Sequence, residues 1–305
     1  QTALRLVIEP IFEHRFAEHS YGFRPGRGCK DALRRVQTLL DEGHTWIVDA
    51  DLKGYFDTIP KERLMSRVEE RIADSRVLAL IRSYLDQGVM DELTLHEPTD
   101  RGTPQGAVIS PLLANIYLDP LDHLLAESGV EMVRYADDFV LLCRSKAAAQ
   151  AALARVQTWV DENGLTLHPG KTRVVDATQP GGFDFLGYHF ERGYRWPRRK
   201  SLDRLKDKVR QLTPRTSGES MEATVARLND TLQGWFGYFK HSHRTTFPAV
   251  DSYVRGRLRS ILRKRVGKRG RGRGTDHQTW RNHTFTELGL FSLSQAHASA
   301  CRSSC

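Results

Sequence analysis

Apolar residues recur with two different periods along the first 190 residues, and each period predicts a different kind of element. Between residues 4 and 16 they return every three or four positions, which predicts an amphipathic helix. The same period predicts the helices that follow: residues 29–40, 61–72, 77–87, 110–125 and 147–162. Two of these helices begin at a proline, Pro60 and Pro111, a residue that favours the first helical turn.

Short apolar runs between these helices predict strands. One run covers residues 44–52, and a second pair, from 132 to 142, forms a hairpin with a polar tip. The shorter predicted strands are residues 94–95, 165–167, 172–175 and 183–190, the last folded around Gly187. From about residue 202 onward the pattern is helical.

The order of these elements predicts the fold class. Strands and helices alternate through residues 44–177 in β-α-β-β-α-β order, which predicts an α/β (α+β) fold with a split βαβ, ferredoxin-like sheet. A length of 305 residues favours two domains. We expect the first to cover residues 1–195 and the second, mostly helical, to cover residues 196–305.

Carboxylates stand at the ends of two predicted strands. Asp51 closes the strand at 44–52, and Asp137 and Asp138 form the tip of the hairpin. Like charges on apolar strands are costly unless cations neutralise them, and Mg²⁺ prefers carboxylate oxygens. We therefore predict a two-metal phosphoryl-transfer site, with Asp138 as a partial ligand and the Leu52 carbonyl completing the oxygen shell. The alternative, an ordinary Asp-Asp turn, does not explain the second acidic strand.

Three further segments carry candidate substrate contacts. Phe56 could exclude a ribose 2′-hydroxyl, although a plain core aromatic is an equal alternative on spacing alone. The loop at residues 101–106 offers backbone N–H groups, the Gln105 amide and Gly106 to a nucleotide, or is an ordinary helix start. Lys171, in a Pro-Gly turn, is a candidate phosphate contact or proton donor to pyrophosphate, and otherwise a surface lysine.

Charge divides the chain into two unlike parts. Residues 1–180 carry 21 Lys and Arg against 27 Asp and Glu, a net −6, whereas residues 181–305 carry 25 against 10, a net +15. The segments 192–215 and 255–273 hold ten Lys and Arg each. Such density beside aromatic residues predicts nucleic-acid binding and is poorly explained as a solvated face. In the acidic part, Arg24, within a Gly/Pro-rich loop, is a further candidate substrate contact.

Composition also excludes several classes. No apolar run approaches the roughly 20 residues needed to span a bilayer, and no secretory signal begins the sequence, so we expect no membrane partner. The four cysteines (Cys29, Cys143, Cys301 and Cys305) are scattered, which favours a reducing cytoplasm over a disulfide framework. Zinc at Cys301, Cys305 and His297 is a weak alternative.

Several motifs occur together in a fixed order: residues 20–28, 49–59, 101–118 with Gly-Thr-Pro-Gln-Gly and Ser-Pro-Leu-Leu-Ala-Asn, 135–138, 164–171 and 185–187. This ordered set resembles the later conserved blocks of bacterial group II intron reverse transcriptases, also called intron-encoded maturases. Residues 234–240, with Trp235 and Phe239, are similar to the thumb or maturase domain of that family. Residues 289–293 resemble its C-terminal block.

The resemblance implies a right-hand polymerase with a palm, partial fingers and an α-helical thumb. It implies RNA-directed DNA synthesis with two Mg²⁺ ions and dNTPs, an RNA template, a DNA primer or target, and a structured group II intron RNA that the protein helps to splice. It also assigns roles to six residues: the catalytic carboxylates Asp51, Asp137 and Asp138, the 2′-hydroxyl gate Phe56, the nucleotide-pocket glutamine Gln105 and the palm lysine Lys171.

Two departures from the family pattern keep alternatives open. The first fingers blocks would precede Gln1, so we expect an N-terminally truncated member, either by deletion or because the natural chain is longer. No His-Asn-His pattern with paired cysteines follows residue 280, so DNA cleavage in cis is not expected. The alternatives are a non-enzymatic RNA-binding maturase and a standalone defence-type or diversity-generating reverse transcriptase. The thumb-like segment at 235–239 argues against the standalone enzymes.

Overall fold

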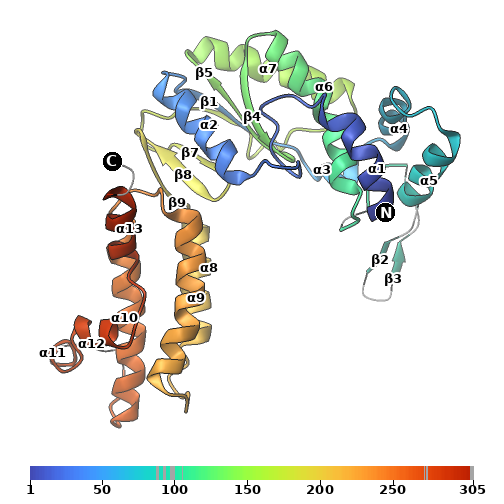
Figure 1. Cartoon of the computed structure of the whole chain (residues 1–305). Coiled ribbons are helices and arrows are strands. Elements are labelled where there is room, and N and C mark those ends of the chain that lie inside the picture. Colours follow the sequence, from blue (N-terminus) through green and yellow to red (C-terminus); the bar gives the residue numbers. More distant parts are fainter. Residues whose placement is uncertain are drawn as a thin grey trace. The chain divides into compact units, whose positions relative to one another are not determined.

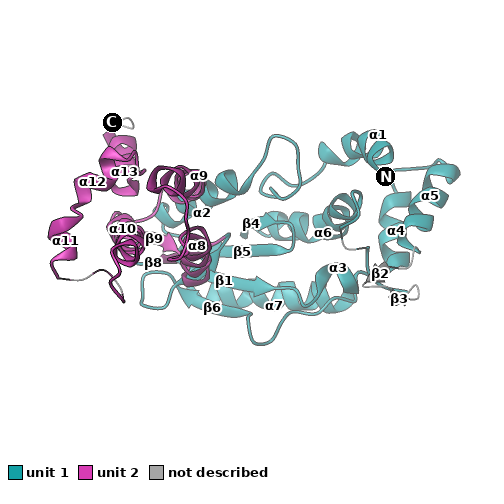
Figure 2. Cartoon of the chain, turned by 90° about the horizontal axis from the view of Figure 1, so that it is seen from below, with its two compact units in different colours: residues 1–186, 191–193 teal, residues 187–190, 194–305 magenta. Residues whose placement is uncertain are grey.

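A computed structural model describes most of the chain as a mixed α and β protein, mostly helical, with antiparallel sheets. It describes residues 1–86, 89–91, 94–96, 100–104, 106–270, 272 and 274–302. The chain separates into two compact units, Gln1–Leu186 with Glu191–Gly193 and Gly187–Phe190 with Tyr194–Cys305 (Figure 2). The mixed α/β class predicted from the sequence is confirmed, and the predicted domain boundary after residue 195 stays a prediction.

A four-stranded antiparallel sheet forms the centre of the first unit (Figure 1). Its strands are β1 (Trp46–Asp51), β4 (Glu131–Tyr135), β5 (Asp138–Cys143) and β6 (Arg173–Asp176). They lie in the order β4-β5-β1-β6, so β1 is flanked by two strands from much later in the sequence. The order brings the end of β1 beside the start of β5, where the predicted carboxylates lie.

The alternation of side chains gives this sheet two different faces. Val48 and Ala50 of β1 and Phe139 and Leu141 of β5 are buried in one apolar core with helices α6 (Ser110–Glu127) and α7 (Lys146–Glu162). Successive residues of a strand point to opposite faces, so the Asp51–Asp138 pair projects from the other face. The acidic side chains therefore avoid the apolar core that the sheet shares with α6 and α7.

The other helices and strands of the first unit have bounds close to those predicted, with the exceptions given below. They are α1 (Thr2–Glu13), α2 (Cys29–Asp41), α3 (Tyr55–Thr58), α4 (Lys61–Glu69), α5 (Ser75–Leu85), β2 (Val89–Asp91), β3 (Thr94–His96) and β7 (Phe183–Phe185). Three details differ from the prediction. Neither the one-turn helix α3 nor the strand β2 was predicted, and residues 165–167 form only an isolated bridge, Leu52 with Leu167, instead of a strand.

The second unit is mostly helical, as the sequence pattern predicts beyond residue 202. Its elements are β8 (Tyr188–Glu191), β9 (Tyr194–Pro197), α8 (Arg199–Leu212), α9 (Met221–Phe239), α10 (Thr246–Arg265), α11 (Asp276–Thr279), α12 (Asn282–Glu287) and α13 (Leu293–Arg302). Helices α8, α9, α10 and α13 share an apolar core. Asp251 of α10 accepts hydrogen bonds from the backbone N–H groups of Leu293 and Ser294, both at 3.0 Å, which fixes α13 to α10.

Candidate active site

Three acidic residues lie at one corner of the sheet. Asp51, the last residue of β1, is the direct partner of Asp138, the first residue of β5. Asp137 precedes it in the two-residue turn that joins β4 to β5, and Ala136 begins that turn with a φ of +59°. A positive φ at this position suits a tight hairpin. The strand register thus brings together predicted acidic residues that are more than 80 positions apart in the chain.

Burial makes negative charge costly at this corner. Burial raises the pKa of Asp137, the charge of Asp51 raises it further, and the nearby Arg134 guanidinium opposes both. Burial also raises the pKa of Asp49 on the same strand as Asp51, against a hydrogen bond from Arg173 Nε at 3.2 Å. A cation placed among these groups would relieve the cost.

A lysine supplies one such cation. Lys171 Nζ lies 2.9 Å from Asp51 Oδ2, and both side chains remain partly exposed. The turn that carries Lys171 is attached to β1, because the His168 N–H donates to the Asp51 carbonyl at 2.7 Å. The structure therefore brings the predicted Lys171 to the carboxylates, where its ammonium group neutralises one of them.

The metal prediction has partial geometric support. Within the described ranges, no group of three or more His, Cys, Asp or Glu side chains is gathered closely enough to hold a metal ion. The donors at the corner are all oxygens, however, which fits Mg²⁺, a hard ion that takes one or two carboxylates and completes its shell with substrate phosphates. The predicted two-ion site stays a prediction.

The Leu52 carbonyl is oriented toward β5. Hydrogen bonds from Lys53 N to Thr166 O at 2.9 Å and from His168 N to Asp51 O at 2.7 Å flank Leu52 on one side of the chain. Peptide groups alternate in direction along an extended strand, so the Leu52 carbonyl faces the opposite side, which is the side of β5. The predicted metal contact of this carbonyl stays a prediction.

Phe56 lies on the short helix α3, and its placement depends on the loop that follows residue 100. The Phe56 carbonyl accepts a hydrogen bond from Thr103 N at 2.7 Å. The Phe56 and Tyr55 ring centroids are 5.6 Å apart in an edge-to-face arrangement. Gly102, at a φ of +91°, passes so close that a Cβ atom would lie 3.1 Å from the Asp57 carbonyl oxygen. The loop and α3 therefore form one packed substructure around a half-buried Phe56.

Two predicted contacts in the same loop remain as predictions. Gln105 lies outside the residues that the structure describes. Gly106 is exposed at a φ of +81°, and a Cβ atom there would have no heavy atom within 4 Å. Only its backbone conformation, which favours glycine, marks this position as special.

Arg24, also predicted as a substrate contact, is occupied within the fold. It is only 6% exposed, and its Nε donates to both carboxylate oxygens of Glu13, at 3.0 and 3.2 Å. Its Nη1 donates to the carbonyls of Ala17 at 2.7 Å and Ser20 at 2.8 Å. These bonds give Arg24 a structural role, and its predicted substrate contact stays a prediction.

A buried arginine that the sequence reasoning missed supports the acidic hairpin. Arg134 is fully buried, and its Nε and Nη2 donate to Asp122 of α6 at 2.8 and 2.5 Å. Its Nη1 donates to the Ala136 carbonyl at 2.8 Å and to Asn115 Oδ1 at 2.9 Å. A charged residue inside the apolar strand directly before the acidic tip was the available signal, because a buried charge requires partners.

The backbone of Gly22 passes directly against the hairpin tip. A Cβ atom at this position would lie 2.2 Å from Ala136 N and 2.9 Å from the Tyr135 carbonyl carbon, so no side chain fits. The Gly22 carbonyl accepts a hydrogen bond from Asn115 Nδ2 at 2.8 Å. Gly22 is therefore the second position that fixes the hairpin and that the sequence reasoning missed.

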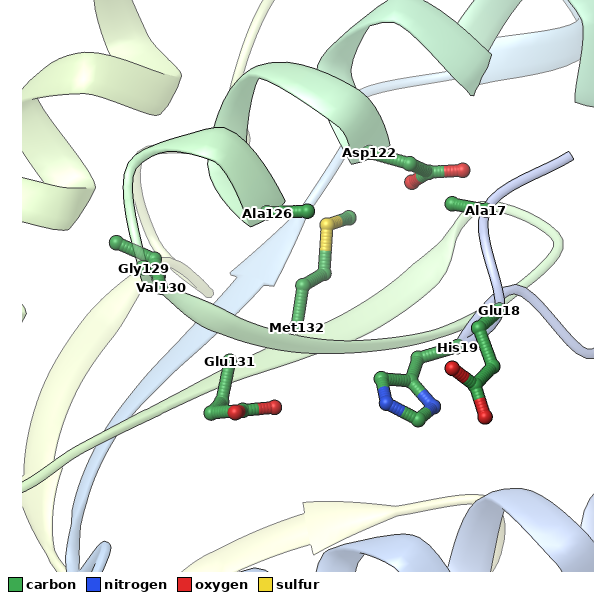
Figure 3. A pocket seen from close by; sticks show the side chains of 9 residues that line it. All are labelled: Ala17, Glu18, His19, Asp122, Ala126, Gly129, Val130, Glu131 and Met132. Carbon is green, nitrogen blue, oxygen red and sulfur yellow. The ribbon is translucent and has the colours of Figure 1, made fainter.

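A cavity of about 260 Å³ opens near the other end of β4 (Figure 3). It is lined by Ala17, Glu18, His19, Asp122, Ala126, Gly129, Val130, Glu131 and Met132. Two of its carboxylates are already engaged: Glu131 binds Arg35 at 2.7 Å and Asp122 binds Arg134. Because Glu131 begins β4 and Tyr135 ends it, this cavity is separate from the carboxylate corner.

The zinc alternative at the end of the chain has one contact to consider. Cys301 Sγ lies 3.8 Å from His297 Nε2, both on α13. Cys305 lies outside the described residues. The zinc interpretation therefore stays a prediction.

Comparison with known proteins identifies the class. The family described as "Reverse transcriptase (RNA-dependent DNA polymerase)" matches residues 1–190. The chain belongs to this reverse transcriptase family. The "Group II intron, maturase-specific domain" matches residues 202–280, so the family member is of the group II intron reverse transcriptase/maturase type. The resemblance stated from the sequence motifs is confirmed.

The chain is also similar to individual proteins. Protein YkfC of Escherichia coli strain K12 is 35% identical over 231 residues, which cover 63% of this chain and 60% of YkfC. The group II intron-encoded protein LtrA of Lactococcus lactis subsp. cremoris is 39% identical over 134 residues, 44% of this chain and 22% of LtrA. The chain therefore spans less than two thirds of the length of either relative.

The fold is also found in a solved telomerase. The structure of telomerase from Candida albicans with a TWJ fragment of telomeric RNA matches with a TM-score of 0.52 at 14% identity, over 95% of this chain and 56% of that one. At this identity the likeness concerns the fold alone. Among the residues described, no helix has the length and apolar character needed to cross a membrane.

Proposed function

We propose that this chain extends a DNA primer on an RNA template, using dNTPs and two Mg²⁺ ions held by Asp51, Asp137 and Asp138. The observation that carries the proposal is the strand register, which pairs Asp51 with Asp138 and leaves Asp137 in the adjoining turn. The antiparallel order β4-β5-β1-β6 supports a palm with a split βαβ, ferredoxin-like sheet. The helices before and after β1 would be partial fingers, and the helical second unit would be a thumb.

The chemistry assigned to the corner follows from its donors. When bound, the two Mg²⁺ ions lower the pKa of the primer 3′-hydroxyl and neutralise charge at the α-phosphate. Asp51 and Asp137 would bridge the ions, and Asp138 and the Leu52 carbonyl would complete the oxygen shell. Burial raises the Asp137 pKa and so works against the ionised carboxylate that a metal ion needs as a ligand.

Lys171 and Phe56 would act on the incoming nucleotide. The Lys171 ammonium, which lies 2.9 Å from Asp51, would contact the triphosphate or protonate the leaving pyrophosphate. Phe56, held by the loop at Gly102 and Thr103, would exclude a ribose 2′-hydroxyl. Gln105 and Gly106 would line the nucleotide pocket, a role that rests on the family resemblance.

A second function, binding and splicing assistance to a structured group II intron RNA, is favoured by two observations. The maturase-specific domain matches residues 202–280, and residues 181–305 carry 25 Lys and Arg against 10 Asp and Glu. This activity needs the basic surface and does not need Asp137. A maturase with an incomplete polymerase site therefore remains the main alternative to the polymerase proposal.

A primer-extension assay distinguishes the polymerase from the RNA-binding maturase. The chain and its Asp137→Ala variant are compared on poly(rA)/oligo(dT) with Mg²⁺, and RNA binding is measured in parallel at several salt concentrations. Extension by the parent chain alone, with equal RNA binding by both proteins, supports the polymerase. Absence of extension from both, with salt-sensitive RNA binding retained, leaves the RNA-binding maturase.

A further inference from the structure

One exposed aromatic side chain near the carboxylate corner is held in an unusual conformation. Phe23 is 49% exposed, and its backbone has a φ of +57°. L-residues with bulky side chains rarely adopt this left-handed region, and such strain persists only where the surrounding structure imposes it. Strained residues concentrate at functional sites, so Phe23 is a candidate for a role beyond packing.

The neighbours of Phe23 impose this conformation. On one side, Gly22 lies against the hairpin tip with no space for a side chain. On the other, Arg24 is fixed by Glu13 and by the Ser20 carbonyl. With both neighbours fixed, Phe23 keeps its left-handed backbone and its side chain stays exposed.

The Phe23 ring lies beside the ring of Tyr135, which belongs to the acidic hairpin. The Phe23 and Tyr135 ring centroids are 6.3 Å apart, at an interplanar angle of 42°. The Tyr135 side chain is hydrogen-bonded with Cys29, so this ring is itself held in place. Tyr135 ends the strand that leads to Asp137, so the aromatic pair adjoins the proposed catalytic corner.

Positive charge in the same segment suits a phosphate backbone. The Arg27 guanidinium lies 5.9 Å from the Tyr21 ring centroid, and Lys30, at the start of α2, is exposed. Aromatic faces beside Lys and Arg form the usual surface for a nucleic-acid strand, since bases stack on the rings and phosphates bind the cations. Without metal ions, the acidic corner next to this segment would repel the phosphates of such a strand. The positive charges of Arg27 and Lys30 would oppose that repulsion.

We propose that Phe23 stacks on a nucleobase of the template–primer duplex and so positions the strand beside the acidic hairpin. This inference rests on the proposed polymerase function. The contact is specific in position along the strand and tolerant of sequence, because every base offers an aromatic face. Arg24, Gly22 and Cys29 act through Phe23 and Tyr135 and do not touch the strand.

Three substitutions in the full chain test the stack. Phe23→Leu removes the ring but keeps an apolar side chain on the same backbone, whereas Phe23→Trp keeps an aromatic face. Leu80→Ala is the matched control, because Leu80 is 41% exposed on α5 and α5 is outside the hairpin. Thermal unfolding of each protein shows whether it is folded.

The measurement is the Kd of an RNA/DNA template–primer duplex by fluorescence anisotropy, without dNTPs. Phe23→Leu should weaken binding about 5- to 150-fold, the range expected for one base–aromatic stack. Phe23→Trp should bind within about threefold of the parent chain, and Leu80→Ala should not change the Kd. The Trp variant also excludes misfolding as the reason for the loss.

Abasic nucleotides identify the base. A series of duplexes carries one abasic nucleotide at each position near the primer end, in either the template or the primer strand. One position should weaken binding by the parent chain yet have no further effect on Phe23→Leu. The strand that contains this position assigns the base to the template or to the primer.

Two results would overturn the stack: Phe23→Leu binding as tightly as the parent chain, or equal abasic effects in both proteins at every position. Neither result depends on catalysis. If the parent chain binds the duplex with the expected pattern but does not extend it, the polymerase proposal fails and the stack holds. If it extends the primer while Phe23→Leu binds normally, only the stack fails.

Discussion

Asp137 illustrates the conflict between stability and chemistry at a single residue. Burial raises the pKa of its carboxyl in the folded chain, so the ionised form destabilises the fold at pH values above that pKa. The penalty fades as pH falls through the folded pKa and is absent below the ordinary carboxyl value of 3.8. The proposed metal ligand is therefore kept at a cost to the metal-free protein.

Asp137→Asn should consequently stabilise the chain while abolishing primer extension. We expect a gain of about 0.5–1 kcal/mol in the free energy of unfolding at pH 7, discounted for partial exposure, and no gain near pH 4. Denaturant unfolding at the two pH values measures both. The exposed Asp161 on α7 provides the control, and Asp161→Asn should change stability by less than about 0.5 kcal/mol. A loss of stability at both pH values would contradict the argument.

Gly22 shows how a residue without a side chain can determine the site. Gly22→Ala would bring a Cβ atom to 2.2 Å from Ala136 N, a backbone atom that can yield only by displacing the hairpin. We expect a loss of about 1–3 kcal/mol of stability, as for overpacked positions, and a loss of primer extension. Thermal unfolding and extension assays measure the two effects.

The control for this substitution is another glycine. Gly234 lies within α9, and a Cβ atom there would meet no heavy atom within 4 Å. Gly234→Ala should therefore stabilise the chain by up to about 1 kcal/mol through helix propensity. Equal stability of the parent chain and Gly22→Ala would mean that the hairpin tip tolerates displacement.

At the scale of elements, a buried ion pair joins helix α6 to strand β4. Arg134→Met alone leaves Asp122 charged and buried, which should cost about 3–5 kcal/mol. The double variant Arg134→Met/Asp122→Leu removes both charges and should recover at least half of that loss. Primer extension should not recover, because the Ala136 carbonyl still lacks its donor at the hairpin tip.

Urea unfolding and extension assays of the three proteins distinguish stability from positioning. If the double variant regains both stability and extension, Arg134 serves only to balance Asp122. If it regains stability alone, Arg134 positions the hairpin that carries Asp137. Phe23→Leu provides a comparison with Arg134→Met, because it should lose duplex binding without losing stability.

The sequence predicts elements better than it predicts their contacts. Helices such as α2 and α7 appear within one or two residues of their predicted bounds, because their apolar period covers three or more turns. Helix α3 has a single turn, too short for any period to show. The acidic site was predictable because each carboxylate ends an apolar run, and such a boundary is visible locally.

What the sequence could not provide is close approach between distant segments. Gly22 meets a hairpin more than 100 residues later, and no local pattern marks a glycine for that purpose. Arg24 illustrates the same limit. Its Gly/Pro-rich loop led to the prediction of a substrate contact, but the sequence does not show that Arg24 donates hydrogen bonds to Glu13 on α1 and to the Ala17 and Ser20 carbonyls. Burial of a charged group is decided by its partners, which come from the tertiary structure.

At the scale of the whole molecule, the two parts of the sequence carry opposite charge. Residues 1–180, with a net charge of −6, contain the carboxylates proposed to hold metal ions, and residues 181–305, with a net charge of +15, offer cations to phosphates. Counterion release should dominate RNA binding by residues 181–305, so RNA affinity should fall steeply as the salt concentration rises. The metal-dependent and salt-dependent steps can therefore be separated by substitutions in different parts of the chain.

Charge reversal on α8 tests this division. Arg204 and Lys208 are exposed and one turn apart on this helix, so Arg204→Glu/Lys208→Glu should weaken RNA binding about tenfold near 0.1 M salt. Each lost phosphate contact should also lower the slope of log Kd against log salt by about one. Binding titrations over a range of KCl concentrations give both quantities.

The control must change the net charge equally, since a less positive protein binds any polyanion more weakly. Arg71→Glu/Arg76→Glu does so in the acidic part of the chain: like the α8 pair, it reverses two exposed cations, lowering the formal charge by four, from +9 to +5. If RNA contacts the basic second unit directly, only the α8 variant loses slope. If both variants lose affinity equally with unchanged slopes, binding follows net charge alone, and α8 is not part of the RNA surface.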